Sequence, residues 1–332
     1  EYGAFAYHQD NGNIAPPTST AYDPSGGGFF DWINRLQLDA SYGSFTGLLR
    51  LDTALYLNPP VAAPGNRRFE TLLLHRYNNR FDLGKASVGY TNKWLEVTLG
   101  DSYVTFGRGL VLSLRKVDEL TIDTSLRGLN VVGKAFGAKV NGVAGFSNII
   151  NIDPGTGRNA EDPNDFIAGA RAEYAIGKYA IPGVDISHIR YSHNFSTEPQ
   201  QNTDQVTAYS ASLELPYLGP YGNAFVEYAQ QRRLIGDSAE KHTAFYGSAS
   251  GYLGPVTALV EYKDYRQYTP IGTSLDQTVY PELALSNFYN AQPTLERLQQ
   301  PILNNSDISG VHARVDVEVC PGFAPFVSFA RF

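Results

Sequence analysis

The amino-acid sequence predicts an all-β protein, a single transmembrane antiparallel up-and-down β-barrel of about 14 to 18 strands formed by residues 1–332. Three observations predict this fold. Apolar and polar residues alternate with a period of two, the alternating segments are long, and short and long connections follow one another. Side chains of a strand point alternately to its two faces, so the alternation gives each strand one apolar and one polar face.

The expected strands are clearest where aliphatic and charged residues alternate. In segment 45–57, Leu49 and Leu55 share one face, and Arg50 and Asp52 share the other. In chain order, strands are expected near 2–8, 32–42, 45–57, 69–90, 94–104, 128–140, 143–150, 166–176, 184–195, 205–215, 222–233, 241–253, 256–268, 308–319 and 323–332.

Many of these segments have about 10 to 13 residues, whereas the usual globular strand has about 5 to 6. A tilted strand of about 10 residues covers the apolar band of a membrane barrel, which is roughly 25 Å tall. A membrane-spanning helix needs about 20 apolar residues, and the purely apolar runs here are far shorter. We therefore expect strands to cross the membrane.

The connections favour a membrane barrel, which has short periplasmic turns and long extracellular loops. A soluble sandwich is the alternative fold, but it would need a second sheet over its apolar faces. Asn141-Gly142 predicts a type I′ hairpin turn. Short turns are expected at 43–44, 91–93, 141–142, 177–183, 216–221, 254–255 and 320–322, and long loops at 9–31, 58–68, 105–127, 151–165, 196–204, 234–240 and 269–307.

Two irregularities stand out in this pattern. The apolar residues of 69–90 lie at odd positions up to Phe81 and at even positions from Ala86 on, which predicts a β-bulge near Gly84. The expected strands number 15, whereas bacterial single-chain barrels have even numbers. Either the count misses one strand or the chain lacks C-terminal strands, and we favour the second interpretation. The chain begins at Glu1 without Met, as a processed exported protein does.

The composition excludes several functions. The net charge of −7 argues against nucleic acid as a partner, because nucleic-acid binding needs clustered Lys and Arg. The single cysteine excludes a disulfide framework and Cys-ligated metal sites. None of the six histidines lies in an HExxH motif, and there is no GxSxG motif. We therefore expect no cofactor, no metal, no catalytic residues and no enzyme.

The strongest candidate site is segment 105–127, a charged loop on the long-loop side. Charged residues of an infolded loop set the size and ion preference of a pore, so we expect a constriction here. The alternative is a continued strand pair whose charges pair with one another. The candidate residues of this segment are Arg108, Arg115, Lys116, Asp118, Glu119 and Arg127.

A second candidate site is the polar face of the strands, which would line the interior. A barrel of about 16 strands is wide enough for a water-filled channel. The alternative is a polar interior sealed by salt bridges and loops. The expected lining residues are Arg35, Arg50, Arg171 and Glu173, together with Asp39, Asp52, Arg76, Arg80, Glu227, Glu261 and Lys263.

Two further patterns are less specific. Aromatic residues near strand ends suit the headgroup level of a membrane, although aromatics also favour any strand. The loop 153–165 has four carboxylates that could hold Ca²⁺, but their spacing does not fit an EF-hand, so a solvated loop is the better expectation. The aromatic set is Tyr42, Phe45, Tyr90, Trp94, Tyr174, Tyr217 and Tyr252.

The chain as a whole resembles Gram-negative outer-membrane β-barrels. Residues 99–110 read LGDSYVTFGRGL, residues 114–120 and 126–128 read LRKVDEL and LRG, and residues 288–297 read FYNAQPTLER. These segments are similar to a poorly characterised family of large exported barrel proteins, whose members are longer and have no established catalytic residues. The resemblance implies the outer membrane of a Gram-negative bacterium, with the lipid bilayer and lipopolysaccharide as surroundings.

The sequence thus favours a porin-like channel for passive diffusion of small hydrophilic solutes. The alternative is a structural barrel that sheaths or anchors a partner, such as an electron-transfer cytochrome or an exported polymer. A protein partner and a homo-oligomer both stay open, because nothing in the sequence shows a subunit interface.

Overall fold

The computed structural model describes residues 2–7, 29–57, 77–117, 122–149, 152, 159, 162–192, 204–236, 238–266, 268–274, 288–293, 308–320 and 322–331. These residues form strands and one short 3₁₀ helix, η3 (Gly219–Tyr221). Nowhere in these ranges is there a helix long and apolar enough to cross a membrane. The strands are β1 (Tyr2–Tyr7), β2 (Phe29–Tyr42), β3 (Phe45–Leu57), β4 (Arg80–Thr91), β5 (Leu95–Ser102), β6 (Val104–Thr105), β7 (Ser113–Leu114), β8 (Lys116–Val117), β9 (Ile122–Asp123), β10 (Ser125–Ala135), β11 (Ala138–Asn148), β12 (Phe166–Tyr174), β13 (Ile181–Arg190), β14 (Gln205–Leu215), β15 (Gly222–Ile235), β16 (Ser238–Leu253), β17 (Val256–Asp264), β18 (Ser309–Val317) and β19 (Phe326–Arg331).

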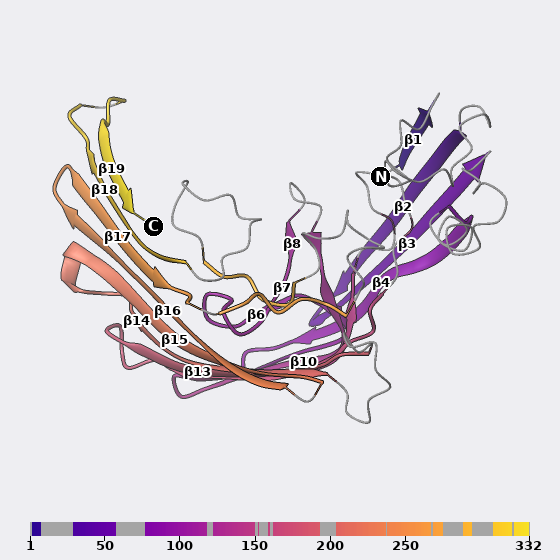
Figure 1. The fold of residues 1–332 in the computed structure, drawn as a ribbon, viewed down its shortest axis with the longest axis horizontal. Coiled ribbons are helices and arrows are strands. Elements are labelled where there is room, and N and C mark those ends of the chain that lie inside the picture. Colours follow the sequence, from indigo (N-terminus) through magenta and orange to yellow (C-terminus); the bar gives the residue numbers. More distant parts are fainter. Residues whose placement is uncertain are drawn as a thin grey trace.

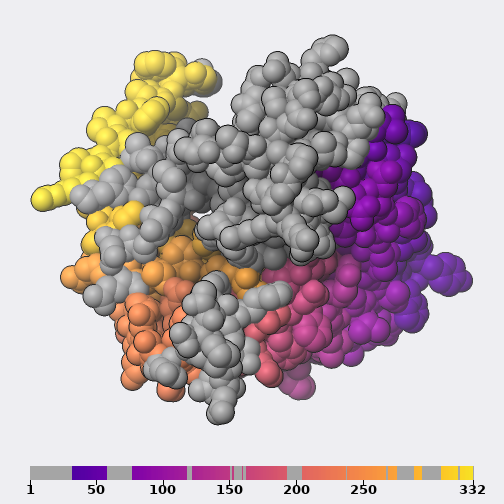
Figure 2. All heavy atoms as spheres, turned by 45° about the vertical axis from the view of Figure 1, so that its right-hand side comes forward, coloured from indigo at the N-terminus to yellow at the C-terminus, as the bar shows by residue number. Residues whose placement is uncertain are grey.

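Fifteen of these strands form one antiparallel sheet in chain order, β1 to β5 followed by β10 to β19. The sheet curls into a deep trough with β1 and β19 at its two edges (Figure 1). The space-filling view shows the same order, with colours running from indigo to yellow around the curve (Figure 2). Among the described pairings, β1 and β19 do not pair with each other. The up-and-down order and the number of strands agree with the prediction.

The two faces of the sheet differ as the alternation predicts. In β3, Leu55 and Leu57 are exposed on the convex face, whereas Arg50 and Asp52 are buried on the concave face. Large apolar side chains are exposed along the whole convex face, such as Val88 at 61%. The described elements form no second layer over this face, so the soluble sandwich is wrong. The exposed apolar surface is that of a strand layer facing lipid.

The bulge in β4 lies where it was predicted. Arg50 of β3 pairs with Lys85, and Leu51 pairs with Leu83, so Gly84 is the extra residue. A Cβ atom at Gly84 would lie 2.4 Å from Asp52 Oδ2, which leaves room only for glycine. Because of the extra residue, Leu83 and Val88 both reach the convex face although their positions differ in parity. Residues 69–76 of the expected strand lie outside the described residues.

The hairpin turn between β10 and β11 corrects the prediction at Asn141-Gly142. The turn residues are Phe136 and Gly137, with φ of +49° and +82°, and Ala135 pairs with Ala138 across them. Positive φ at both central residues is the mark of a type I′ turn. A turn at 141–142 would have placed Lys139 on the apolar convex face. The observed register instead turns Lys139 to the concave face, where its Nζ lies 3.1 Å from Glu173.

Candidate functional site

The concave face is covered by two long connections that fold back into the trough. Inner loop 1 joins β5 to β10, and its described residues are 103–117 and 122–124. It contains the small ladders β6–β7 and β8–β9, and β6, β7 and β8 lie inside the curve of the sheet (Figure 1). Inner loop 2 joins β17 to β18, and its described residues are 265–266, 268–274, 288–293 and 308.

The first arm of inner loop 1, residues 104–114, is anchored by apolar contacts. Phe106, Leu110, Leu112 and Leu114 are fully buried. They form one cluster with inward side chains of the sheet, and the Ser187 hydroxyl of β13 donates a hydrogen bond to the carbonyl of Val111 at 3.0 Å. The sheet members of the cluster are Leu126, Val143, Ile167, Ile189, Val206, Ala208, Phe225, Ala229, Ala244 and Tyr246.

Two glycines in this arm hold Arg108 at the surface of the interior. Gly107 and Gly109 have φ of +54° and +92°, which favours glycine. A Cβ atom at Gly107 would lie 2.7 Å from Glu227 Oε1, and one at Gly109 would lie 2.7 Å from the carbonyl oxygen of Ala291. The N–H of Arg108 donates to Glu227 Oε2 at 2.9 Å. The turn therefore fixes the backbone of Arg108 on a buried carboxylate.

The side chain of Arg108 is exposed and stacks over the ring of Phe225, with Cζ 4.6 Å from the ring centre. Among the described residues its guanidinium has no ion-pair partner. An aromatic face stabilises a guanidinium without neutralising it. The positive charge of Arg108 is therefore exposed on the interior surface.

Inner loop 2 packs directly on the first arm of inner loop 1. The N–H of Ser113 donates to the carbonyl of Tyr289 at 2.7 Å, and the N–H of Ala291 donates to the carbonyl of Gly109 at 2.9 Å. The amide of Asn290 donates to the carbonyl of Leu110 at 3.0 Å. The described part of the predicted extracellular loop 269–307 thus lies inside the trough. Residues 275–287 and 294–307 lie outside the described residues.

Asp165 joins three loops at the long-loop end of the sheet. Its carboxylate is fully buried and accepts hydrogen bonds from the N–H of Ser192 at 2.8 Å, the N–H of Ser274 at 2.9 Å and the Tyr289 hydroxyl at 2.7 Å. The solvated loop expected here is therefore wrong for Asp165. Asp153 and Glu161 lie outside the described residues, and the described ones include no cluster able to hold a metal.

A chain of charges crosses the concave face of β11 to β15. Arg171 Nη1 lies 3.0 Å from both carboxylate oxygens of Asp185, and Arg171 Nη2 lies 2.8 Å from Glu173. The Ser210 hydroxyl contacts both Asp185 and Glu227 at 2.9 Å. The predicted lining residues Arg171 and Glu173 thus face the interior, where they pair with each other.

The second arm of inner loop 1, described for residues 115–117 and 122–124, is anchored by ion pairs. Asp123 Oδ2 lies 2.6 Å from Arg50 Nη1, and Asp123 Oδ1 lies 3.1 Å from Lys85 Nζ. The Tyr103 hydroxyl also donates to Asp123 at 2.6 Å. Burial opposes ionisation of Asp123, but Lys85 and Arg50 outweigh it and lower its pKa to about 2. Asp123 is therefore a carboxylate that holds two buried cations.

The remaining predicted residues are spread over this arm and the nearby strands. Arg35 pairs with Asp52 at 3.0 Å. Arg127, which is 42% exposed, lies 3.2 Å from Asp101. Arg115 is half-buried, which lowers its pKa, and Lys116 is exposed on β8. Asp118 and Glu119 lie outside the described residues. The predicted residues therefore form no single ring among those described.

Ser328, His312 and Glu261 are hydrogen-bonded in the order of a serine-hydrolase triad. Ser328 Oγ lies 2.9 Å from His312 Nε2, and His312 Nδ1 lies 3.0 Å from Glu261 Oε2. His312, however, is only 2% exposed. Ser328 lies in a regular strand, whose successive N–H groups point to opposite edges and cannot converge on one oxyanion. We interpret the set as a hydrogen-bonded part of the wall.

Comparisons with known proteins agree with this fold. Residues 36–252, more than half of the chain, match DUF6029, a family of unknown function. No curated protein matches. OpdO of Pseudomonas aeruginosa is similar in structure, with a TM-score of 0.52 and 11% identity over 91% of this chain and 73% of that chain. OccK11 (OpdR) of the same organism has a TM-score of 0.50 and 10% identity over 99% of this chain and 77% of that chain.

A third solved structure is the outer membrane protein OpdK of Pseudomonas aeruginosa, with a TM-score of 0.49 and 13% identity over 91% of this chain and 76% of that chain. The up-and-down sheet, its apolar convex face and its charged concave face define a transmembrane barrel fold. The chain therefore belongs to the DUF6029 family and has the fold of an outer-membrane β-barrel.

Proposed function

We propose that the protein is a porin-like channel in the outer membrane of a Gram-negative bacterium, passing small hydrophilic solutes by passive diffusion. The observation that supports this proposal is the contrast between the two faces. The convex face is apolar, whereas the concave face has charges of both signs, including Arg50, Asp52, Arg171 and Asp185. Charged groups can replace part of the hydration of a solute inside a pore.

Inner loop 1 is the proposed constriction of this channel. It lies inside the trough, it is anchored at both arms, and it holds the guanidinium of Arg108 on the interior surface. Arg115 and Lys116 continue the loop beyond β7, and Asp118, Glu119 and Arg127 follow them in the sequence. In this proposal Arg108 is the charge that acts on a solute, because Arg50 and Lys85, the cations that the second arm contacts, are paired with Asp123.

The described residues include no feature that favours a barrel sheathing a cytochrome or an exported polymer, so we do not propose that role. We also propose no catalytic activity.

Single-channel conductance in planar bilayers tests the channel. We expect Arg108→Ala to change the anion-to-cation permeability ratio by roughly two- to fivefold, the effect of about 0.4 to 1 kcal/mol of partly screened charge. Lys178→Ala removes one cation at the short β12–β13 turn and is the matched control, with no change expected. A folded, inserted protein that passes no current would overturn the channel. If the protein conducts but Arg108→Ala leaves the permeability ratio unchanged, only the proposed constriction is overturned.

A further inference from the structure

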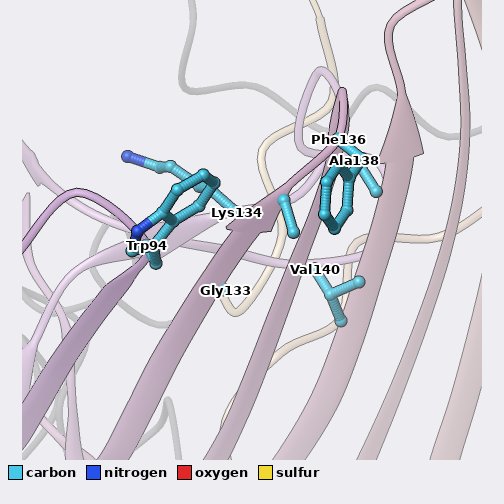
Figure 3. Close-up of a pocket in the computed structure, with 7 residues that line it drawn as sticks. Trp94, Gly133, Lys134, Phe136, Ala138 and Val140 are labelled. Carbon is cyan, nitrogen blue, oxygen red and sulfur yellow. The ribbon is translucent and has the colours of Figure 1, made fainter.

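The convex face has an apolar groove at the short-turn end of the sheet. Trp94, in the turn before β5, and Phe136, in the β10–β11 turn, lie on its two sides, and Val140 of β11 lies below Phe136 (Figure 3). The groove has a volume of about 470 Å³, and Gly133, Ala135 and Ala138 complete the apolar lining.

The large apolar side chains that line the groove are exposed. Phe136 is 93% exposed and Trp94 is 54% exposed, and both lie on the face that contacts lipid. The one charged lining residue, Lys134, pairs with Glu96 and points away from Phe136 (Figure 3). The groove itself is therefore suited to a hydrocarbon chain, and Trp and Tyr side chains prefer the level of the lipid headgroups.

A cation lies beside Trp94, the residue on one side of the groove. Lys93 Nζ is 4.9 Å from the centre of the Trp94 ring, and Lys93 is exposed. In the part of the chain that the structure describes, Lys93 has no carboxylate partner. An exposed ammonium next to one wall of an apolar groove complements a molecule with an anionic head and an apolar tail.

We propose that this groove binds one anionic phospholipid of the leaflet at the short-turn end, with an acyl chain along Trp94 and Phe136 and the phosphate on Lys93. The site depends on the transmembrane fold and on no property of the channel. Its occupant is a lipid because the groove opens to the membrane rather than to the interior of the barrel.

The chain offers a direct optical probe of this site, because Trp94 is one of only two tryptophans. Trp32→Phe leaves Trp94 as the single tryptophan, which is excited selectively at wavelengths that tyrosine does not absorb. Vesicles of phosphatidylcholine are titrated with phosphatidylglycerol brominated on its acyl chains, and bromine quenches a tryptophan that it contacts. We expect quenching of Trp94 to saturate at a low fraction of brominated phosphatidylglycerol, and to need about fivefold more brominated phosphatidylcholine.

Two variants separate the head and tail contacts. Lys93→Gln should remove the preference for phosphatidylglycerol, whereas Lys178→Gln, which removes a cation stacked on Tyr217 elsewhere at this end, should retain it. Gly133→Val should fill the groove and weaken quenching by both lipids. A Cβ atom at Gly133 meets no atom within 4 Å, so the substitution is accommodated. Gly142→Val, equally unhindered but outside the groove lining, is its control.

Equal quenching by the two brominated lipids, or a preference that survives Lys93→Gln, would overturn the proposal. Far-UV circular dichroism of each variant in the same vesicles confirms that the sheet is intact. Conductance of the same samples is independent of this result, so failure of the lipid site and failure of the channel are distinguishable.

Discussion

The two arms of inner loop 1 lie on the same concave surface but are held there by different forces. The first arm buries Phe106 and Leu112 against aliphatic side chains of the sheet, and the second arm joins Asp123 to Arg50 and Lys85. Apolar contacts are not directional, whereas a buried ion pair is costly to break, because removal of one partner leaves a buried charge without full compensation. The first arm, which holds Arg108, therefore depends on apolar packing, and the second arm depends on charge pairing.

The largest effect should come from removing the carboxylate of the second arm. Asp123→Ala leaves Arg50 and Lys85 buried beside each other, and we expect a loss of about 3 to 5 kcal/mol of stability. Urea unfolding in detergent micelles, followed by tryptophan fluorescence, measures it. A loss below about 1 kcal/mol would mean that the two cations find other partners, and the second arm would then not depend on Asp123.

Acid should reproduce part of this loss in the unmodified protein. The pKa of Asp123 is lowered from 3.8 to about 2 in the folded state. Its contribution is therefore complete above its unfolded pKa and disappears as the pH falls from about 4 through about 2. Asp123→Ala should flatten the stability curve over this window.

A smaller effect is expected from the first arm. Leu112→Ala removes a fully buried side chain, and such truncations cost about 2 to 5 kcal/mol, with the low end where neighbours close the cavity. Because the aliphatic surroundings of this arm can close in, we expect a value near the low end and little dependence on pH between 2 and 4. The same urea titration measures it. A pH-dependent loss equal to that of Asp123→Ala would show that the two arms respond as one unit.

The smallest effect is expected from a substitution that pushes the two inner loops apart and removes no contact with the sheet. Gly109→Ala adds a methyl group 2.7 Å from the carbonyl of Ala291 and strains a φ of +92°, for about 1 to 3 kcal/mol. Gly254→Ala is the matched control, because its φ is also positive and its Cβ atom would meet nothing. Limited proteolysis should cleave inner loop 2 faster in Gly109→Ala only. Equal cleavage of both variants would disprove the close approach at Ala291.

The strands could be predicted from the sequence because their signal is local. The switch of apolar parity at Gly84 and the alternation of Arg50 and Asp52 with leucines depend only on neighbouring residues and the lipid outside. The hairpin at 136–137 was missed because a favourable Asn-Gly pair competed with the need to turn Lys139 inward. The burial pattern of the whole strand therefore determined the position of the turn, against the local preference of Asn141-Gly142.

The interior could be predicted only in part. The charges of segment 105–127 predicted an infolded loop. The glycines on both sides of Arg108 are explained only by the structure, because Glu227 and Ala291 leave no room for a larger side chain. The sequence analysis placed Asp165 only in a solvated loop and did not single out Tyr289 as its partner, because the two residues are 124 positions apart along the chain. One signal was present. Residues 288–293 and the motif around Arg108 both resemble the same family, and in the structure they pack against each other. No periodicity relates two loops that meet only after the sheet has curled.

The hydrogen bond between Asn290 and Leu110 spans 180 positions of the chain. Closure of such distant contacts is slow, because much chain entropy is lost before any contact forms. We therefore expect inner loop 2 to cover residues 110–114 late in folding, at a stage when the wall is largely built and its lining is still uncovered. Arrest at that stage would leave a leucine-rich segment open to chaperones and proteases.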